Sequence, residues 1–304
     1  MDEAASARIM VIDNDERVGV YLREILEAQQ YAVHVVEGFG KQLIETALQE
    51  ARRYRPHVAI VDLRLVDDYS DDRTGLTLLE HLYSTRCILH SNYLTAEVLR
   101  TVRRKYPEAD WADKHEPSMV LAAVEDAAKQ MSARLTGKTL LWPPRWEHQQ
   151  IAARLVEENT PDLPPEMLDD IVVQLFPQYR RIQPEAIDGA IGDMRAVVRG
   201  GTFVAKVYPD HFEPQILKLS NAAKAQREQE HYRQYIQHLL VGLFSTQLVK
   251  SAEFWDLGGA VYNFIGASNQ TLPTFATFYG RQDDGETILR PLRHFFTSVW
   301  RNHY

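Results

Sequence analysis

Six polar residues lie at or just beyond the ends of short apolar segments, and together they could handle a phosphoryl group. These residues are Asp13, Asn14, Asp15, Asp62, Ser91 and Lys114. A carboxylate can attack a phosphoryl donor, further oxygen ligands can hold Mg²⁺, and an ammonium and a hydroxyl can bind phosphoryl oxygens. Because the six are far apart in the sequence, this chemistry requires a fold that gathers them.

Apolar segments and helical patterns alternate along the first part of the chain. Strands are expected at 8–13, 31–38, 56–65, 86–91 and 110–113, and helices at 16–28, 40–54, from about 75, at 95–105 and at 117–131. The alternation predicts an α/β fold, a (βα)5 doubly wound parallel sheet with helices on both faces. In such a sheet, residues at the carboxyl ends of the strands meet at one edge.

At that edge the acidic residues would have different chemical roles. Asp62 would be the nucleophile, while Asp13 with Asn14 or Asp15 would hold Mg²⁺, a cation that prefers oxygen ligands. Lys114 would pair with a phosphoryl oxygen. Carboxylates this close repel one another, so we expect the site to bind a metal or to raise a carboxylate pKa.

Residues 7–133 resemble the receiver domain of two-component response regulators. The segments that carry the resemblance are VIDNDE at 11–16, VDLRL at 61–65, LHSN at 89–92 and DWADK at 110–114. The resemblance implies that Asp62 is the phosphoacceptor, assisted by Lys114 and Ser91. It also implies that Trp111 is a conformational switch residue, and that a sensor histidine kinase or a phosphotransfer protein is the partner.

Some positions depart from the receiver pattern. Asn14 replaces the second acidic residue, and the receiver proline that follows the lysine is absent at His115. Arg64 would offer Mg²⁺ only its backbone carbonyl, and its side chain could instead reach a phosphoryl group. These departures keep open the alternative of a degenerate receiver that acts as a protein-interaction scaffold.

A Pro-Pro breaker marks the end of the first domain. We expect domain 1–133 to be followed by a linker with helices at 134–178, which contains Pro143 and Pro144. Its two helices, at 147–158 and 165–175, could pack against either domain or form a dimerising or signalling element. The pattern therefore leaves a homodimer open.

Strand-like segments dominate the third region, 179–304. Strands are expected at 180–187, 195–201, 202–209, 214–220, 246–255 and 258–266, with helices at 222–240 and 285–303. This layout resembles the N-lobe of protein-kinase-like and aminoglycoside-phosphotransferase-like folds, an α+β domain with a mostly antiparallel five-stranded sheet. By that resemblance, Lys218 would hold nucleotide phosphates and Glu228 would hold the lysine.

A kinase-like fold also needs a C-lobe with a catalytic Asp, and too little sequence follows Tyr279 to supply one. We expect the second domain to be truncated, with ATP a cofactor only of a longer parent protein. Stand-alone activity is then not expected beyond phosphorylation and hydrolysis at Asp62.

Composition narrows the remaining possibilities. The formal net charge is −8, and residues 1–133 carry 16 Lys and Arg against 23 Asp and Glu, so neither part has the basic excess of a nucleic-acid-binding protein. The single cysteine, Cys87, excludes an intrachain disulfide, and no apolar run is long enough for a membrane helix. We expect a cytoplasmic protein.

Three functions remain open from the sequence. The first is a response regulator that controls its kinase-like region through the linker, and the second is an ATP-dependent phosphotransferase regulated by the receiver. The third is a scaffold in which neither site is chemically active.

Overall fold

The computed structural model describes residues 7–66, 72–156, 162–187, 198–210, 212–237, 247–265, 280, 284–294 and 297. The chain forms two compact units. The first is Met1–Gly137 with Val172–Pro177, and the second is Lys138–Ile171 with Gln178–Tyr304. The expected linker 134–178 is therefore divided between the two units.

The first unit is built on a five-stranded, all-parallel sheet in the order β2-β1-β3-β4-β5. This confirms the predicted parallel sheet. The strands are β1 (Arg8–Ile12), β2 (Ala32–Val36), β3 (Val58–Val61), β4 (Arg86–His90) and β5 (Asp110–Ala112). The helices are α1 (Glu16–Glu27), α2 (Gly40–Tyr54), α3 (Thr74–His81), α4 (Ala96–Lys105) and α5 (Pro117–Met131).

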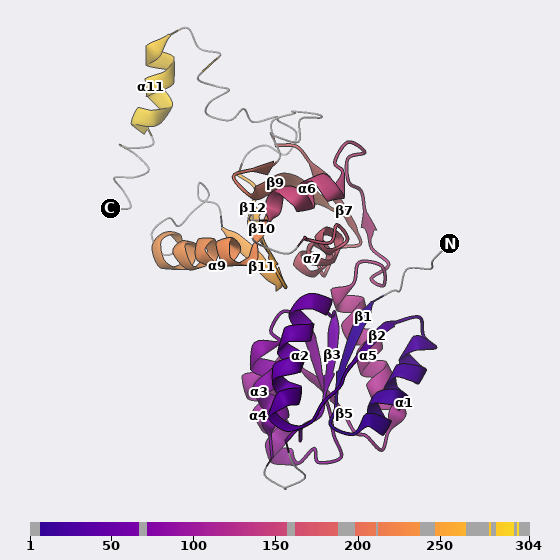
Figure 1. Ribbon diagram of the computed structural model, residues 1–304. Helices are drawn as coiled ribbons and strands as arrows, with labels where there is room; N and C mark the ends of the chain where they lie inside the picture. Colours follow the sequence, from indigo (N-terminus) through magenta and orange to yellow (C-terminus); the bar gives the residue numbers. More distant parts are fainter. Residues whose placement is uncertain are drawn as a thin grey trace. The chain divides into compact units, whose positions relative to one another are not determined.

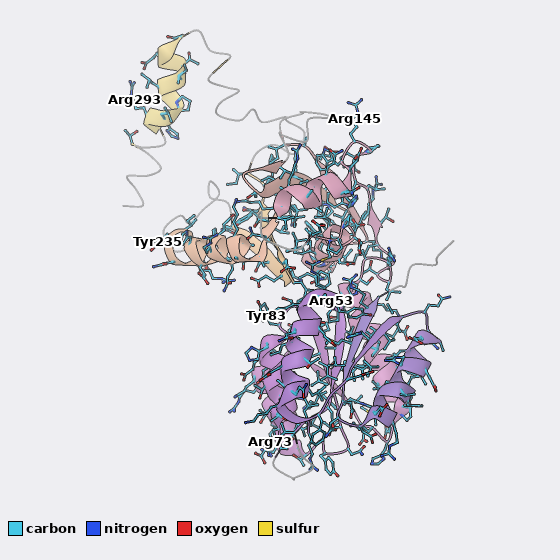
Figure 2. All side chains as sticks on the ribbon, in the orientation of Figure 1. Arg53, Arg73, Tyr83, Arg145, Tyr235 and Arg293 are labelled. Atoms are coloured by element: carbon cyan, nitrogen blue, oxygen red, sulfur yellow. The ribbon has the colours of Figure 1, made fainter. Side chains whose placement is uncertain are left out.

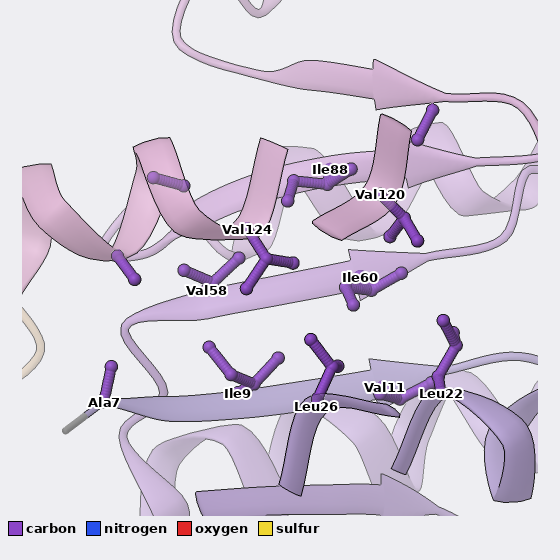
Figure 3. Packing of buried hydrophobic residues seen from close by; sticks show 13 residues of the cluster. Ala7, Ile9, Val11, Leu22, Leu26, Val58, Ile60, Ile88, Val120 and Val124 are labelled. Carbon is purple, nitrogen blue, oxygen red and sulfur yellow. The ribbon is translucent and has the colours of Figure 1, made fainter. Parts of the chain in front are cut away.

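Helices cover both faces of this sheet (Figure 1). Ile9 and Val11 of β1 belong to a buried cluster that α1 and α5 complete with Leu22, Leu26 and other residues (Figure 3). Successive side chains of a strand point to opposite faces, so Met10 and Ile12, which are fully buried, face the side that carries α2. The continuous apolar runs in the sequence reflect this burial on both faces.

N-cap residues and a first-turn proline mark the starts of several helices. The side chain of Asp15 accepts a hydrogen bond from the Arg17 amide at the start of α1, and Thr95 does the same for the Val98 amide at the start of α4. Pro117 lies in the first turn of α5, where its missing N–H costs nothing. These helices therefore begin within a residue of their predicted starts.

The second unit holds a seven-stranded sheet. Six strands follow the order β11-β12-β10-β9-β7-β6, and β8 pairs with β9. The strands are β6 (Thr139–Leu140), β7 (Arg181–Glu185), β8 (Val198–Arg199), β9 (Thr202–Pro209), β10 (Gln215–Asn221), β11 (Leu248–Phe254) and β12 (Leu257–Asn263). The helices are α6 (His148–Leu155), α9 (Ala222–His231), the π-helix η1 (Tyr232–Ile236) and α11 (Gly285–His294), while α7 (Met167–Leu175) begins in the second unit and ends in the first.

The two faces of this sheet differ in chemistry. Phe203, Leu217 and other apolar residues are fully buried on one face, and the rings of Trp142 and Trp146 lie 5.8 and 5.5 Å from the Phe203 ring. The opposite face carries Lys218, which packs toward α9 through Glu228. The strand alternation thus separates an apolar core from a polar face.

The prediction of five strands in the second sheet is wrong. Strand β6, which was not expected, pairs in parallel with β7, so the sheet is mixed, and β8, which lies within the strand expected at 195–201, pairs antiparallel with β9 as a further strand. A two-residue strand such as β6 is too short to leave a periodic pattern in the sequence. The antiparallel arrangement of β7, β9, β10, β12 and β11 is as predicted.

The second unit's helices differ from prediction in extent. The helix expected over 222–240 is α9 followed by a π-helical turn, and the C-terminal helix is described only as Gly285–His294. Residues 272–279 (LPTFATFY), whose sequence resembles the entry to a C-lobe in phosphotransferase-like folds, lie outside the described residues, as do residues 67–71 of the Asp-rich loop after β3. Among the described residues, no helix is long and apolar enough to cross a membrane.

Large exposed aromatic residues occur in both units. Figure 2 labels Tyr83 in the first and Tyr235 in the second, and these side chains are 74% and 55% exposed. Single exposed aromatic residues are common on protein surfaces.

Candidate functional site

Three charged side chains meet at the carboxyl edge of the parallel sheet. The Nζ atom of Lys114 lies 2.8 Å from Oδ2 of Asp13 and 3.0 Å from Oδ2 of Asp62. The Asp13, Asp62 and Lys114 side chains are only 2%, 7% and 14% exposed. The loops after β1, β3 and β5 therefore bring together an ammonium and two carboxylates that are almost excluded from water.

Ser91 joins this group from the loop after β4. It is 1% exposed and lies beside the Asp62 carboxylate, where its hydroxyl helps to lower the pKa of Asp62 against the effect of burial. The amide of Tyr93 in turn donates to Ser91 Oγ over 3.3 Å. The amide of Leu63 donates to Asp62 Oδ1 over 2.7 Å. Asp62 thus contacts groups from the loops after β3 and β5, with Ser91 of the loop after β4 beside it.

Asp15 and Asn14, the other two residues predicted to hold Mg²⁺, have different surroundings. Asp15 turns its carboxylate to Arg17, which donates from Nε and Nη2 over 3.1 and 2.9 Å, while the Asp15 amide donates to Asp13 Oδ1. Asn14 is half-buried. In the described part of the chain, no group of three or more His, Cys, Asp or Glu side chains is arranged to hold a metal ion.

Burial and mutual repulsion perturb the titration of this site. Burial, followed by the nearby Asp62 charge, raises the pKa of Asp13 to about 6, although Lys114 opposes the shift. Burial likewise raises the pKa of Asp62, again opposed by Lys114. Burial lowers the pKa of Lys114, but the two carboxylates outweigh that effect and leave it raised. One ammonium therefore does not fully compensate two buried carboxylates.

Gly75 fixes the backbone around the acceptor. A Cβ atom at this position would lie 1.9 Å from the carbonyl oxygen of Asp62, and the Gly75 amide donates to the carbonyl of Leu63 over 3.0 Å. Only glycine permits this approach. The start of α3 is thereby pressed against the end of β3.

Two further predicted residues border the site. The Arg64 guanidinium stacks on the ring of Tyr93, with its carbon 3.2 Å from the ring centroid, and Arg64 is 7% exposed. Trp111 of β5 is half-buried, and the guanidinium of Arg103 in α4 lies over its ring at 4.8 Å. Trp111 therefore contacts α4, the helix that follows Ser91.

A second polar cluster lies on the open face of the other sheet. Lys218 of β10 forms an ion pair with Glu228 of α9, and the Tyr262 hydroxyl donates to Glu228 Oε1 over 2.9 Å. This group borders a cavity of about 760 Å³, which is also lined by Lys224, Arg227, His231, Ile216, Tyr232 and Ile236. The cavity walls carry more positive than negative groups. The structure therefore brings together both residues that the sequence singled out in this unit.

Sequence reasoning missed two partners, Tyr93 and Tyr262. Both contact a predicted residue that is distant in sequence, Arg64 in one case and Glu228 in the other. Tyr93 lies two positions after Ser91, just as Arg64 lies two positions after Asp62, and this parallel spacing was the available signal. Tyr262 lies in an apolar run, and no comparable signal in the sequence pointed to it.

Comparisons with known proteins found that this chain is similar only to solved structures. Models of known protein families do not match the chain, and neither do curated proteins. The chemotaxis protein CheY4 of Vibrio cholerae is 15% identical, covering 40% of this chain and 99% of its own, with a TM-score of 0.33. The BeF3-activated receiver domain of Klebsiella pneumoniae RstA is 19% identical, covering 40% and 98%, with a TM-score of 0.33.

A third similarity is to the signal receiver domain of a modulated diguanylate cyclase from Desulfovibrio desulfuricans G20. It is 20% identical, with 40% of this chain and 93% of that one covered and a TM-score of 0.24. These identities and TM-scores are too low to establish a family or a function for the chain.

Proposed function

We propose that the first unit accepts a phosphoryl group on Asp62 and acts as the receiver of a phosphorelay. The observation that carries this proposal is the Lys114 ammonium held within 3.0 Å of both the Asp13 and Asp62 carboxylates. An Asp62 oxygen would attack the donor phosphorus, and the bond from phosphorus to the donor's leaving atom would break. Lys114 and the Ser91 hydroxyl would then hold the phosphoryl oxygens.

The residues present fit a Mg²⁺ ion. Mg²⁺ is commonly held by one or two carboxylates and keeps several waters, so Asp13 and Asp62 suffice, with the Arg64 carbonyl as a further oxygen ligand. Burial raises the pKa of both carboxylates, and the Asp62 charge adds to the rise at Asp13, so a bound cation would favour their ionised forms. Bound there, Mg²⁺ would neutralise charge on the phosphoryl oxygens during transfer.

The natural donor would be a sensor histidine kinase or a phosphotransfer protein. The half-buried Trp111, in contact with α4, is the element through which phosphorylation would reach a partner or the second unit.

Mass spectrometry of the intact chain tests this function. Incubation with an acyl phosphate and Mg²⁺ should add about 80 Da to the wild type. Asp62→Asn should gain no adduct, while Asp126→Asn, which changes an exposed carboxylate on α5, should react normally. If the wild type gained no adduct, or if Asp62→Asn gained an equal one, phosphorylation of Asp62 would be contradicted. The hypothesis of a scaffold with no chemically active site would then remain.

Nucleotide binding by the second unit is a second candidate function. Its support is the strand order β7-β9-β10-β12-β11 with α9 inserted between β10 and β11, and the Lys218–Glu228 ion pair. This order resembles the layout of a kinase-like N-lobe, in which the lysine would bind nucleotide phosphates.

Calorimetric titration with Mg²⁺-ATP tests the second candidate. We expect weak binding, with a Kd of about 1 mM, because a single lobe would contact one side of the nucleotide. Lys218→Met should abolish the heat of binding, and Lys105→Met, an exposed lysine of α4, should leave it unchanged. Identical titrations for Lys218→Met and the wild type would contradict this function.

A further inference from the structure

The cavity beside α9 has a charged end and an apolar end. Lys224 and Arg227, in the first half of α9, line it together with Lys218 of β10. Ile216, which lies on the same face of β10 as Lys218, and Ile236 of η1 also line it, and both pack against one apolar cluster. Both walls of the cavity therefore change from charged to apolar in the same direction.

Glu228 is the one carboxylate among the described residues that line the cavity. Lys218 forms an ion pair with it, and the Tyr262 hydroxyl donates to its Oε1 atom over 2.9 Å. The negative charge of Glu228 is therefore already balanced by Lys218, and it does not compensate any other cation of the cavity.

Lys224 and Arg227 contact backbone carbonyls rather than acidic side chains. Lys224 Nζ donates to the carbonyl of Gly200, in the turn between β8 and β9, and Arg227 Nε donates to the carbonyl of Ala223 over 3.4 Å. In the described part of the chain, neither side chain pairs with a carboxylate. Since they are three residues apart, they lie on the same side of α9. The charged end of the cavity therefore carries a positive charge that only an anionic ligand would balance.

We propose that this cavity binds a chain of phosphoryl groups along α9, through Lys224 and Arg227 as well as Lys218, and does so irrespective of the attached base. This inference deepens the proposed nucleotide site and rests on it. A single phosphoryl group would meet only some of these cations, whereas a di- or triphosphate can contact all three. Each phosphate oxygen that accepts from an ammonium or a guanidinium forms a charge-assisted hydrogen bond, the stronger class of such bonds.

The apolar end of the cavity gives the physical reason for the weak influence of the base. Discrimination between bases requires hydrogen-bonding groups directed at the base edges. The side chains of Ile216 and Ile236 have none, and the Tyr232 hydroxyl already accepts a hydrogen bond from the Leu248 amide over 3.0 Å. This end would therefore bury the apolar surface of a base, a gain that adenine and guanine share.

NMR titration of the ¹⁵N-labelled full-length chain without added Mg²⁺ tests this inference, because it measures weak binding and identifies the amides that respond. The probes are ATP, GTP, AMP, adenosine and inorganic tripolyphosphate. GTP and tripolyphosphate should each bind with a Kd within about threefold of that of ATP, and AMP should bind at least ~10-fold more weakly. Adenosine should not bind measurably. The largest shifts with tripolyphosphate should come from amides of α9 and β10.

Arg227 is exposed, so it can be replaced without disturbing a buried contact. Arg227→Gln should weaken the binding of both ATP and tripolyphosphate by about 5- to 10-fold, the factor that one charge-assisted hydrogen bond supports. Arg227→Lys keeps the charge and should stay within about threefold of the wild type. Arg290→Gln removes an exposed arginine of α11 that does not line the cavity, and it serves as the matched control.

The possible outcomes separate this inference from the nucleotide-binding function. If ATP bound but tripolyphosphate did not, or if Arg227→Gln bound both as tightly as the wild type, the role of α9 would be refuted and nucleotide binding through Lys218 would stand. A clear preference of ATP over GTP would refute recognition irrespective of the base. If neither ATP nor tripolyphosphate bound, the nucleotide-binding function and this inference would fail together.

Discussion

Replacing Asp13 with asparagine should stabilise the first unit at neutral pH in the absence of Mg²⁺. The structure places two nearly buried carboxylates against one ammonium, and burial together with the Asp62 charge raises the pKa of Asp13 from 3.8 to about 6. A group whose pKa is higher in the folded state is disfavoured there when ionised. Asparagine has a similar shape and no charge.

The size and the pH window follow from that shift. About two pKa units correspond to about 3 kcal/mol, and since the variant also leaves Lys114 with one carboxylate fewer, we expect a gain of about 1–3 kcal/mol. Ionised Asp13 lowers wild-type stability progressively as the pH rises from about 4 to about 6. The advantage of Asp13→Asn should therefore be small near pH 4 and full above pH 6.

Hydrogen exchange of the amides in β1 and β3 is the appropriate assay, because it reports opening of the first unit alone in the full-length chain. Asp126→Asn removes an exposed carboxylate and serves as the control. If Asp13→Asn were less stable than the wild type at pH 7.5, the Lys114 ion pair would outweigh burial and repulsion, and the reasoning would be refuted. A difference that did not vary with pH would refute it equally.

Three further outcomes are expected. Mg²⁺ at tenfold its Kd should stabilise the wild type by about 1.4 kcal/mol and Asp13→Asn by less, measured by the same exchange. Gly75→Ala should destabilise by more than about 2 kcal/mol in urea unfolding, because its Cβ would meet the Asp62 carbonyl, whereas Gly285→Ala fills open space and should be nearly neutral. Burial raises the pKa of Cys87 to about 12, so a thiol reagent should modify it at least ~100-fold more slowly in the folded chain than in urea.

The first sheet could be predicted because its signals are local and repeated. Apolar strands alternate with amphipathic helices, and the carboxyl ends of parallel strands must share one edge. Asp13, Asp62, Ser91 and Lys114 could therefore be grouped from the sequence. The predicted strand 56–65 is longer than β3 because the apolar run continues into a buried loop beyond Asp62.

The remaining differences have physical reasons that sequence patterns do not carry. Asp15 could be a metal ligand or a helix cap, and both choices suit an aspartate before α1; the contact with Arg17 favours the cap. Strand β6 is specified by its pairing with β7 rather than by any periodicity of its own. The side-chain contacts of Tyr93 and Tyr262 depend on loop and sheet geometry over long sequence separations.

The two-residue strand β6 has a consequence for self-association. It pairs through Thr139 and Leu140 with Arg181 and Ile182, and so occupies backbone hydrogen-bonding groups that β7 would otherwise present at the border of its sheet. Unpaired borders of this kind recruit strands from neighbouring molecules, and very short strands are poor templates for such recruitment. A brief piece of the chain preceding α6 thus helps to keep separate copies of the protein from joining sheet to sheet.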